Sequence, residues 1–175
     1  MRILRLITGC LVLTFFAGCG AETTAAPELA IGASGGGEGG ARLATGSGHV
    51  PQGSGLREFT FHAKGTGEGG IARGSYKVEL TSSGLFFEVE VSCMAVEGNT
   101  AWIAGHISDT NASVIQVGSV SYFYAIDNGE GAGAPADVVS TARINDIDGE
   151  DQVFCNERPL LLASFAIDQG NVQIR

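Results

Sequence analysis

The sequence predicts an all-β fold, an antiparallel β-sandwich or closed β-barrel of about eight or nine strands. Apolar and polar residues alternate with a period of two in several segments, as in strands with one buried and one exposed face. Turns rich in glycine separate these segments at short intervals, and the chain has 27 glycines. No segment of ten or more residues shows the three- and four-residue apolar spacing of a helix, which argues against an α/β fold.

The clearest element is a predicted β-hairpin over residues 86–107, which turns at Glu97-Gly98-Asn99. Trp102 and Ile103 lie on opposite parities, so we expect one of them to face away from the core unless a bulge intervenes. The alternation predicts that one buried face carries Phe87, Val89, Val91 and Cys93.

The remaining strands follow from the same alternation. Phe59 and Phe61 are expected to face the core together, whereas His62 is expected to be exposed. Tyr122, Phe123 and Tyr124 are consecutive, so either both faces of their strand are buried or one aromatic ring is exposed. The predicted strands cover residues 41–50, 56–63, 71–80, 117–126, 138–144, 160–167 and 170–175.

Residues 1–18 have the features of a bacterial lipoprotein signal peptide. Two arginines precede an apolar run, and Ala17-Gly18-Cys19 closes it. This pattern resembles a lipobox and predicts lipidation of Cys19, with a bacterial cell-envelope location in the outer membrane, the periplasm or the cell surface; ordinary secretory cleavage near the same place is the alternative. Residues 19–40 then form the lipidated cysteine and a Gly-rich tether, and residues 41–175 form a single β domain.

The charge of the chain argues against nucleic acid as a partner. The full sequence carries a net charge of −9, and loss of residues 1–18 removes two arginines and no acid, which makes it −11. Such an acidic domain does not attract phosphate backbones or anionic lipid surfaces. The expected partners are the membrane, through the lipid, and another envelope protein or a small apolar ligand.

Two cysteines remain in the predicted domain, Cys93 and Cys155. Outside the cytoplasm such a pair predicts a disulfide, and two buried free thiols are the alternative. A bridge that closes a loop of this length stabilises the fold by about 4 kcal/mol in the chain-entropy model.

Two acidic loops are candidates for calcium, which prefers six to eight oxygen ligands. The full EF-hand pattern is absent, and solvated loops whose charges aid solubility are the alternative interpretation. We expect no other cofactor. The candidate ligands are Asp146, Asp148, Glu150 and Asp151 in one loop and Asp127 and Glu130 in the other.

No motif points to catalysis. His49, His62 and His106 lie on three different predicted strands, with no spacing typical of a zinc or copper site. Ser47 lacks the strand–turn–helix context of a serine nucleophile, and no pair of acids is marked out for glycoside hydrolysis. We therefore expect that the protein is not an enzyme, with a hydrolase as a remote alternative.

Five segments together, at residues 44–50, 57–64, 96–107, 125–137 and 170–175, carry a resemblance to a known group. They resemble uncharacterised exported bacterial β-domain proteins and, more distantly, the post-COAP domain of bacterial surface proteins. Those proteins share a GN-x-A turn, a DNGE-like loop and a terminal GNIQIH-like strand, although Gly131-Ala132 here replaces a proline. The resemblance implies a β fold outside the cytoplasm and implies no particular chemistry.

The sequence thus predicts a lipid-anchored, non-catalytic β domain with a structural or interaction role. The alternative is a carrier of a small apolar ligand, with a calycin-like barrel and an aromatic interior. A lumen of several hundred Å³ would favour the carrier, and a filled core would argue against it.

Overall fold

A computed structural model describes residues 40–53, 55–160 and 162–175 of the chain, and these contain ten strands and one helix. The predicted all-β, antiparallel fold is confirmed. The strands are β1 (Arg42–Gln52), β2 (Gly55–Gly65), β3 (Glu68–Leu80), β4 (Leu85–Glu97), β5 (Thr100–Thr110), β6 (Val120–Ile126), β7 (Val138–Ser140), β8 (Arg143–Asn145), β9 (Ser164–Ala166) and β10 (Gln169–Ile174), and the helix is α1 (Glu150–Glu157).

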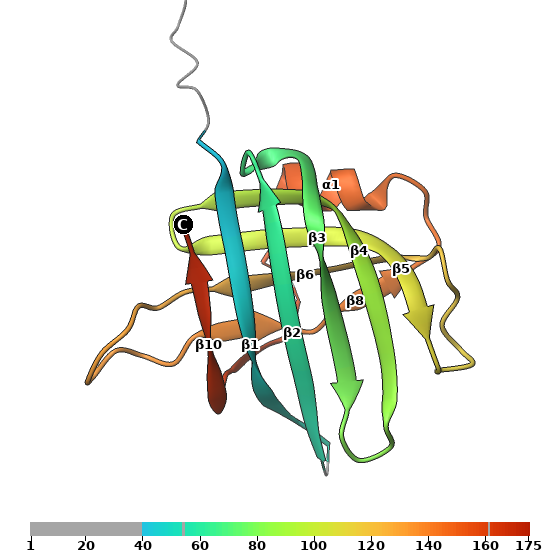
Figure 1. Ribbon diagram of the computed structural model, residues 1–175, viewed down its shortest axis with the longest axis horizontal. Helices are drawn as coiled ribbons and strands as arrows, with labels where there is room; N and C mark the ends of the chain where they lie inside the picture. Colours follow the sequence, from blue (N-terminus) through green and yellow to red (C-terminus); the bar gives the residue numbers. More distant parts are fainter. Residues whose placement is uncertain (1–39, 54, 161) are drawn as a thin grey trace, which may run out of the picture. The chain divides into compact units, whose positions relative to one another are not determined.

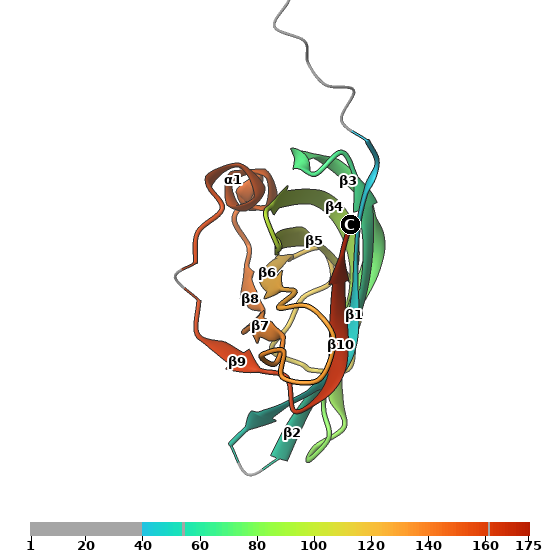
Figure 2. The same cartoon turned by 90° about the vertical axis from the view of Figure 1, so that its left-hand side faces the viewer.

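All ten strands belong to one sheet (Figure 1 and Figure 2). Nine of them follow the order β10-β1-β2-β3-β4-β5-β6-β7-β9, and β8 pairs with β6 outside this path. Neighbours from β1 to β7 follow one another in sequence, and β10 returns to the other side of β1. The predicted strand at 138–144 is two short strands. β7 pairs with Ala125 and Ile126 of β6, and β8 pairs with the other end of β6.

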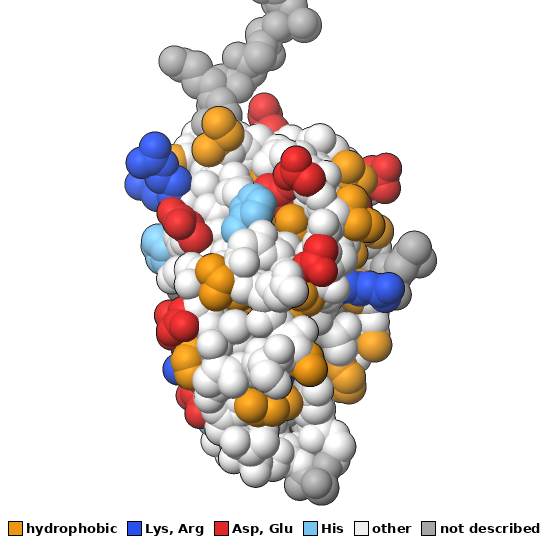
Figure 3. Space-filling model, turned by 90° about the vertical axis from the view of Figure 1, so that its right-hand side faces the viewer, with side chains coloured by type: hydrophobic (Ala, Val, Ile, Leu, Met, Phe, Trp, Pro, Cys, Tyr) orange, Lys and Arg blue, Asp and Glu red, His pale blue; other side chains and the backbone are white. Residues whose placement is uncertain are grey.

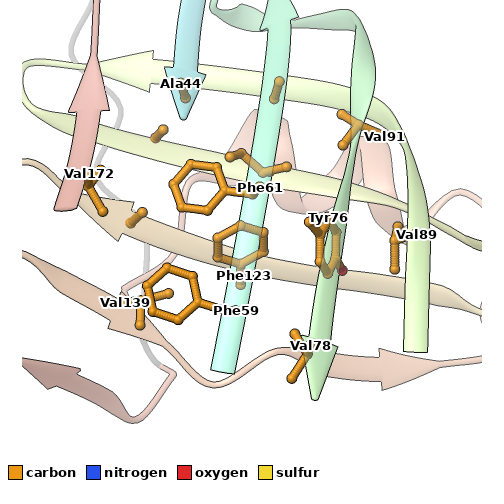
Figure 4. Packing of buried hydrophobic residues seen from close by; sticks show 14 of the residues in the cluster. Ala44, Phe59, Phe61, Tyr76, Val78, Val89, Val91, Phe123, Val139 and Val172 are labelled. Carbon is orange, nitrogen blue, oxygen red and sulfur yellow. The ribbon is translucent and has the colours of Figure 1, made fainter. Parts of the chain in front are cut away.

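The sheet curls into a half-barrel, so that β1, β2, β3 and β10 face β6, β7 and β8 across the core (Figure 2). Phe59, Phe61 and Tyr76 point from one side toward Phe123 on the other (Figure 4). Phe123 meets Phe61 edge-on at 5.3 Å between ring centroids and Tyr76 at 4.8 Å. The inward positions of Phe59 and Phe61 were predicted from alternation, and the packed rings fill the inside of the curl.

A β-bulge at Ser92 changes which face the later residues of β4 occupy. Val91 pairs with Gly105 and Cys93 pairs with Ala104, so Ser92 is an extra residue without a partner. Val91 faces the inner core, but Cys93 belongs to a second cluster on the outer face. The prediction that Cys93 shares a face with Phe87, Val89 and Val91 was therefore wrong, because the bulge reverses the alternation.

Helix α1 and the segment after it cover the outer face of β4, β5 and β6 (Figure 2). Trp102 is buried there while Ile103 is buried in the inner core, so both faces of β5 are covered. The same holds for β6, where Tyr122 stacks on Phe154 of α1 at 4.5 Å and Phe123 points inward. The helix was not predicted, because its eight residues are mostly polar and carry no clear apolar stripe.

Carboxylates bridge the seam between β10 and the β6–β7 connection. The backbone N–H of Val172 donates to Asp137 Oδ2 at 2.7 Å, and that of Ile174 donates to Asp127 Oδ2 at 3.0 Å. These are alternate residues of an edge strand, whose outward N–H groups have no neighbouring strand to accept them. Two acidic side chains thus take the place of a strand, and the half-barrel is bridged here without a β-ladder.

A candidate binding groove and the predicted site residues

The predicted signal peptide, the lipidation site Cys19 and the tether up to residue 39 lie outside the described residues. Within the described part of the chain, no helix is long and apolar enough to cross a membrane. The predicted anchor therefore stays a prediction from the sequence.

The predicted disulfide is confirmed, since Cys93 and Cys155 are bonded and both are fully buried. The bridge joins the residue after the bulge in β4 to the inner side of α1. Beside it, Ser92 Oγ of the bulge donates a hydrogen bond to Asp151 Oδ2 at 2.5 Å. The disulfide and this hydrogen bond together attach α1 to the bulge in β4. Asp151, which accepts the hydrogen bond, lies in the first turn of α1.

The two predicted calcium loops lie at opposite ends of β6. Asp127 follows Ile126 at one end, whereas Asp146 accepts a hydrogen bond from Ser119, which precedes Val120 at the other. The two loops therefore do not combine their carboxylates into one site. Among the described residues, no three His, Cys, Asp or Glu side chains are grouped to hold a metal.

Most of the candidate calcium ligands have other partners. Glu130 Oε1 accepts from the side-chain amides of Asn171 and Gln173, at 3.1 Å and 2.7 Å, so it joins Asp127 at the β10 seam. Asp148 is exposed in its loop, and Glu150 lies in the first turn of α1. Binding of calcium by one of these loops alone stays a prediction to be tested.

The three histidines do not gather into a site in the part of the chain that the structure describes. His49 pairs with Glu58 across β1 and β2, with Nε2 and Oε2 3.7 Å apart. His62 is exposed, as predicted, and His106 is exposed on β5.

The inside of the half-barrel is filled by side chains. Between Phe59, Phe61, Tyr76 and Phe123 the remaining cavity is about 10 Å³, which is roughly the space of one water molecule. A lumen of several hundred Å³, as the calycin-like alternative requires, is not found among the described residues.

A larger hollow, which we call the end groove, opens at the end of the sheet where β2 begins and β3 ends. Its volume is about 260 Å³. Val78 and Leu80 of β3 and Leu85 of β4 form one wall. The groove is lined by Gln52, Arg57, Val78, Leu80, Leu85, Phe86, Phe87, Ala112, Val114, Ile115, Thr141 and Ala142.

Asn111 holds the loop that forms the opposite wall of the end groove. Its side-chain oxygen accepts from the Phe86 N–H at 2.8 Å, and its amide donates to the Gly84 carbonyl at 2.9 Å. These bonds fix the loop after β5 against the start of β4. Val114, 91% exposed, consequently stands at the mouth of the groove, and Ile115 packs toward the core.

Arg57 contributes a buried cation to the end groove. The residue is 5% exposed and has the same parity on β2 as Phe59 and Phe61, so it faces inward. Its Nη2 donates to the Ser140 carbonyl at 3.2 Å, and the guanidinium lies 5.5 Å from the centre of the Phe165 ring. Burial lowers the pKa of Arg57 from its ordinary value, because a charged group is disfavoured away from water.

Comparisons of the chain with protein-family models, with curated proteins and with solved structures found no match in any of the three. The resemblance to the post-COAP domain therefore remains an expectation from sequence motifs.

Sequence reasoning missed the end groove and the place of Arg57 in it. One signal was available, since Arg57 falls on the inward parity of its strand, two residues before Phe59. The other walls come from residues far apart in the chain, between Gln52 and Ala142. Only the folded sheet brings them together.

Proposed function

We propose that this protein is a lipid-anchored, non-catalytic β domain that acts outside the cytoplasm and binds a small apolar ligand in the end groove. The groove itself is the observation that carries the proposal. At about 260 Å³ it lies just below the range of about 300–1,000 Å³ that is usual for drug-sized ligands, so a smaller molecule fits it. The predicted signal and lipobox support the envelope location.

The composition of the groove supports binding rather than chemistry. Eight of its twelve lining residues are Ala, Val, Leu, Ile or Phe on β3, β4 and the loop after β5, and one more is Ala142. The polar residues are Gln52, Arg57 and Thr141, and none of the lining residues is an acid, a histidine, a serine or a cysteine. These are not the groups from which a hydrolase builds a nucleophile and a base.

Binding of an environment-sensitive apolar dye such as N-phenylnaphthylamine tests the proposal. We expect saturable fluorescence enhancement that Val114→Asp weakens about tenfold or more, because the new charge must stay hydrated beside an apolar wall. Ile71→Asp is the matched control. Ile71 is 80% exposed and lies outside the groove, so its substitution should leave dye affinity unchanged.

Two outcomes would contradict ligand binding at this place. Equal weakening by both variants would show that the dye binds to the surface without selectivity. A dye that does not bind the wild-type protein at all would leave the other reading of the sequence, a domain with a purely structural role or one that contacts another envelope protein.

A further inference from the structure

We infer that the ligand of the end groove is a medium-chain monocarboxylate, with its apolar chain in the groove and its carboxylate on the guanidinium of Arg57. This inference rests on the proposed function and adds the chemical class of the ligand. It comes from a buried cation that lacks a charged partner in the described structure and that lines an apolar hollow.

The first observation is that Arg57 is buried with no described carboxylate beside its guanidinium. Arginine is almost never fully buried unless it is paired, because removing its charge from water is costly. None of the described carboxylates lies within 4.0 Å of this guanidinium. The group has five N–H donors, and among the described residues a single acceptor, the Ser140 carbonyl, is in hydrogen-bond range.

The second observation is where the charge lies. Arg57 lines both the end groove and the small interior cavity, and its Nη2 contacts the carbonyl of Ser140, which also lines the interior cavity. No acid lines the groove, although the chain carries a net charge of −9. The face shown in Figure 3 bears acidic side chains and few basic ones. A buried arginine in an acidic protein, reached through an apolar groove, complements a ligand with one negative end.

The residues that line the groove indicate which kind of anion fits it best. A guanidinium matches a carboxylate, which it can bind through two parallel N–H···O bonds. Neither Lys nor His is among the lining residues, so one positive charge matches a singly charged head group. The apolar walls formed by Leu80, Leu85 and Ile115 then suit a medium-length alkyl chain rather than a polar body.

Three probes with the same alkyl chain test the head group: octanoate, octanol and octylamine, each competing with the apolar dye. Hydrogen bonds to charged groups predict that the wild-type protein binds octanoate about tenfold to hundredfold more tightly than octanol. Octylammonium should bind more weakly than octanol. In Arg57→Met the preference of octanoate over octanol should fall to about one, with octanol binding retained.

The fold of Arg57→Met is expected to persist, because the substitution removes an unpaired charge that is costly to bury and replaces it by a flexible apolar side chain of similar length. Arg57→Lys keeps the charge without the planar fork and should retain only part of the preference. Intermolecular NOEs from the C2 protons of octanoate to the Arg57 side chain would locate the head group without any variant.

The outcomes separate this inference from the proposed function. Equal affinity of the wild-type protein for octanoate and octanol would overturn the carboxylate and leave the groove as an apolar site. A preference that survives in Arg57→Met, or NOEs from the C2 protons only to residues distant from Arg57, would overturn the role of this residue. If neither the dye nor any of the three probes binds, the proposed function itself fails.

Discussion

Asp137 gives the sharpest test of how the half-barrel is held together. Its carboxylate is 6% exposed and accepts two backbone hydrogen bonds, from Val172 N–H at 2.7 Å and from Asn128 N–H at 2.8 Å. Asp137→Ala leaves both donors without their acceptor, and Val172 is fully buried. Because each hydrogen bond to a charged group contributes about 1.5–3 kcal/mol, we expect the loss of both to lower the free energy of unfolding by about 3–6 kcal/mol.

Urea unfolding at neutral pH, followed by far-ultraviolet circular dichroism, measures this loss. Asp148→Ala is the matched control, since it removes the same charge from an exposed loop position and should cost less than about 0.5 kcal/mol. Asp137→Asn keeps one acceptor oxygen and should fall between the two. A difference of less than about 1 kcal/mol between Asp137→Ala and Asp148→Ala would refute the idea that carboxylates substitute for a strand at this edge.

Four further predictions follow from the fold and the sequence. The double variant Cys93→Ala/Cys155→Ala should lose about 4 kcal/mol in urea unfolding, because the bridge closes a loop over a separation of 62 residues; a loss below about 1 kcal/mol would contradict this. Burial raises the pKa of Tyr76 in the folded state. The contribution of Tyr76 to the free energy of unfolding is therefore fully present below about pH 10, the pKa of tyrosine in the unfolded chain, and declines as the pH rises above that value. Thermal unfolding between about pH 8 and 11 should show this decline, and Tyr76→Phe should reduce it. Cells fed an alkynyl fatty acid should label the wild-type protein, and labelling that persists in Cys19→Ala would contradict lipidation there. Melting temperatures with calcium and with a chelator should agree, and a calcium-dependent increase would instead support a site in one of the acidic loops.

Alternation predicted the inward face of β2, because the period of two is a local property of each strand. Phe59 and Phe61 face the inner core as expected, and for Tyr122 and Phe123 on β6 the structure selects the alternative in which both faces are buried. The reversal at Ser92 could not be predicted in the same way. A bulge depends on which residues of β5 lie opposite, and that register exists only in the folded sheet.

The acidic residues show the other limit of sequence reasoning. Asp127 and Glu130 were identified as oxygen ligands, and their oxygens do accept bonds, but from β10. Composition reveals how many acceptors a loop holds, whereas the donors that they meet are set by the path of the last strand. The disulfide was predictable, since only Cys93 and Cys155 remain in the domain; the end groove was not, because strands distant in the sequence form its walls.

Strand β1 separates the start of the described domain from the end groove. The chain enters β1 at Arg42, where Leu43 pairs with the C-terminal Arg175, and leaves it at Gln52, on the rim of the end groove. Eleven extended residues separate these points by about 35 Å. The start of the described chain and the mouth of the end groove therefore lie at opposite ends of β1.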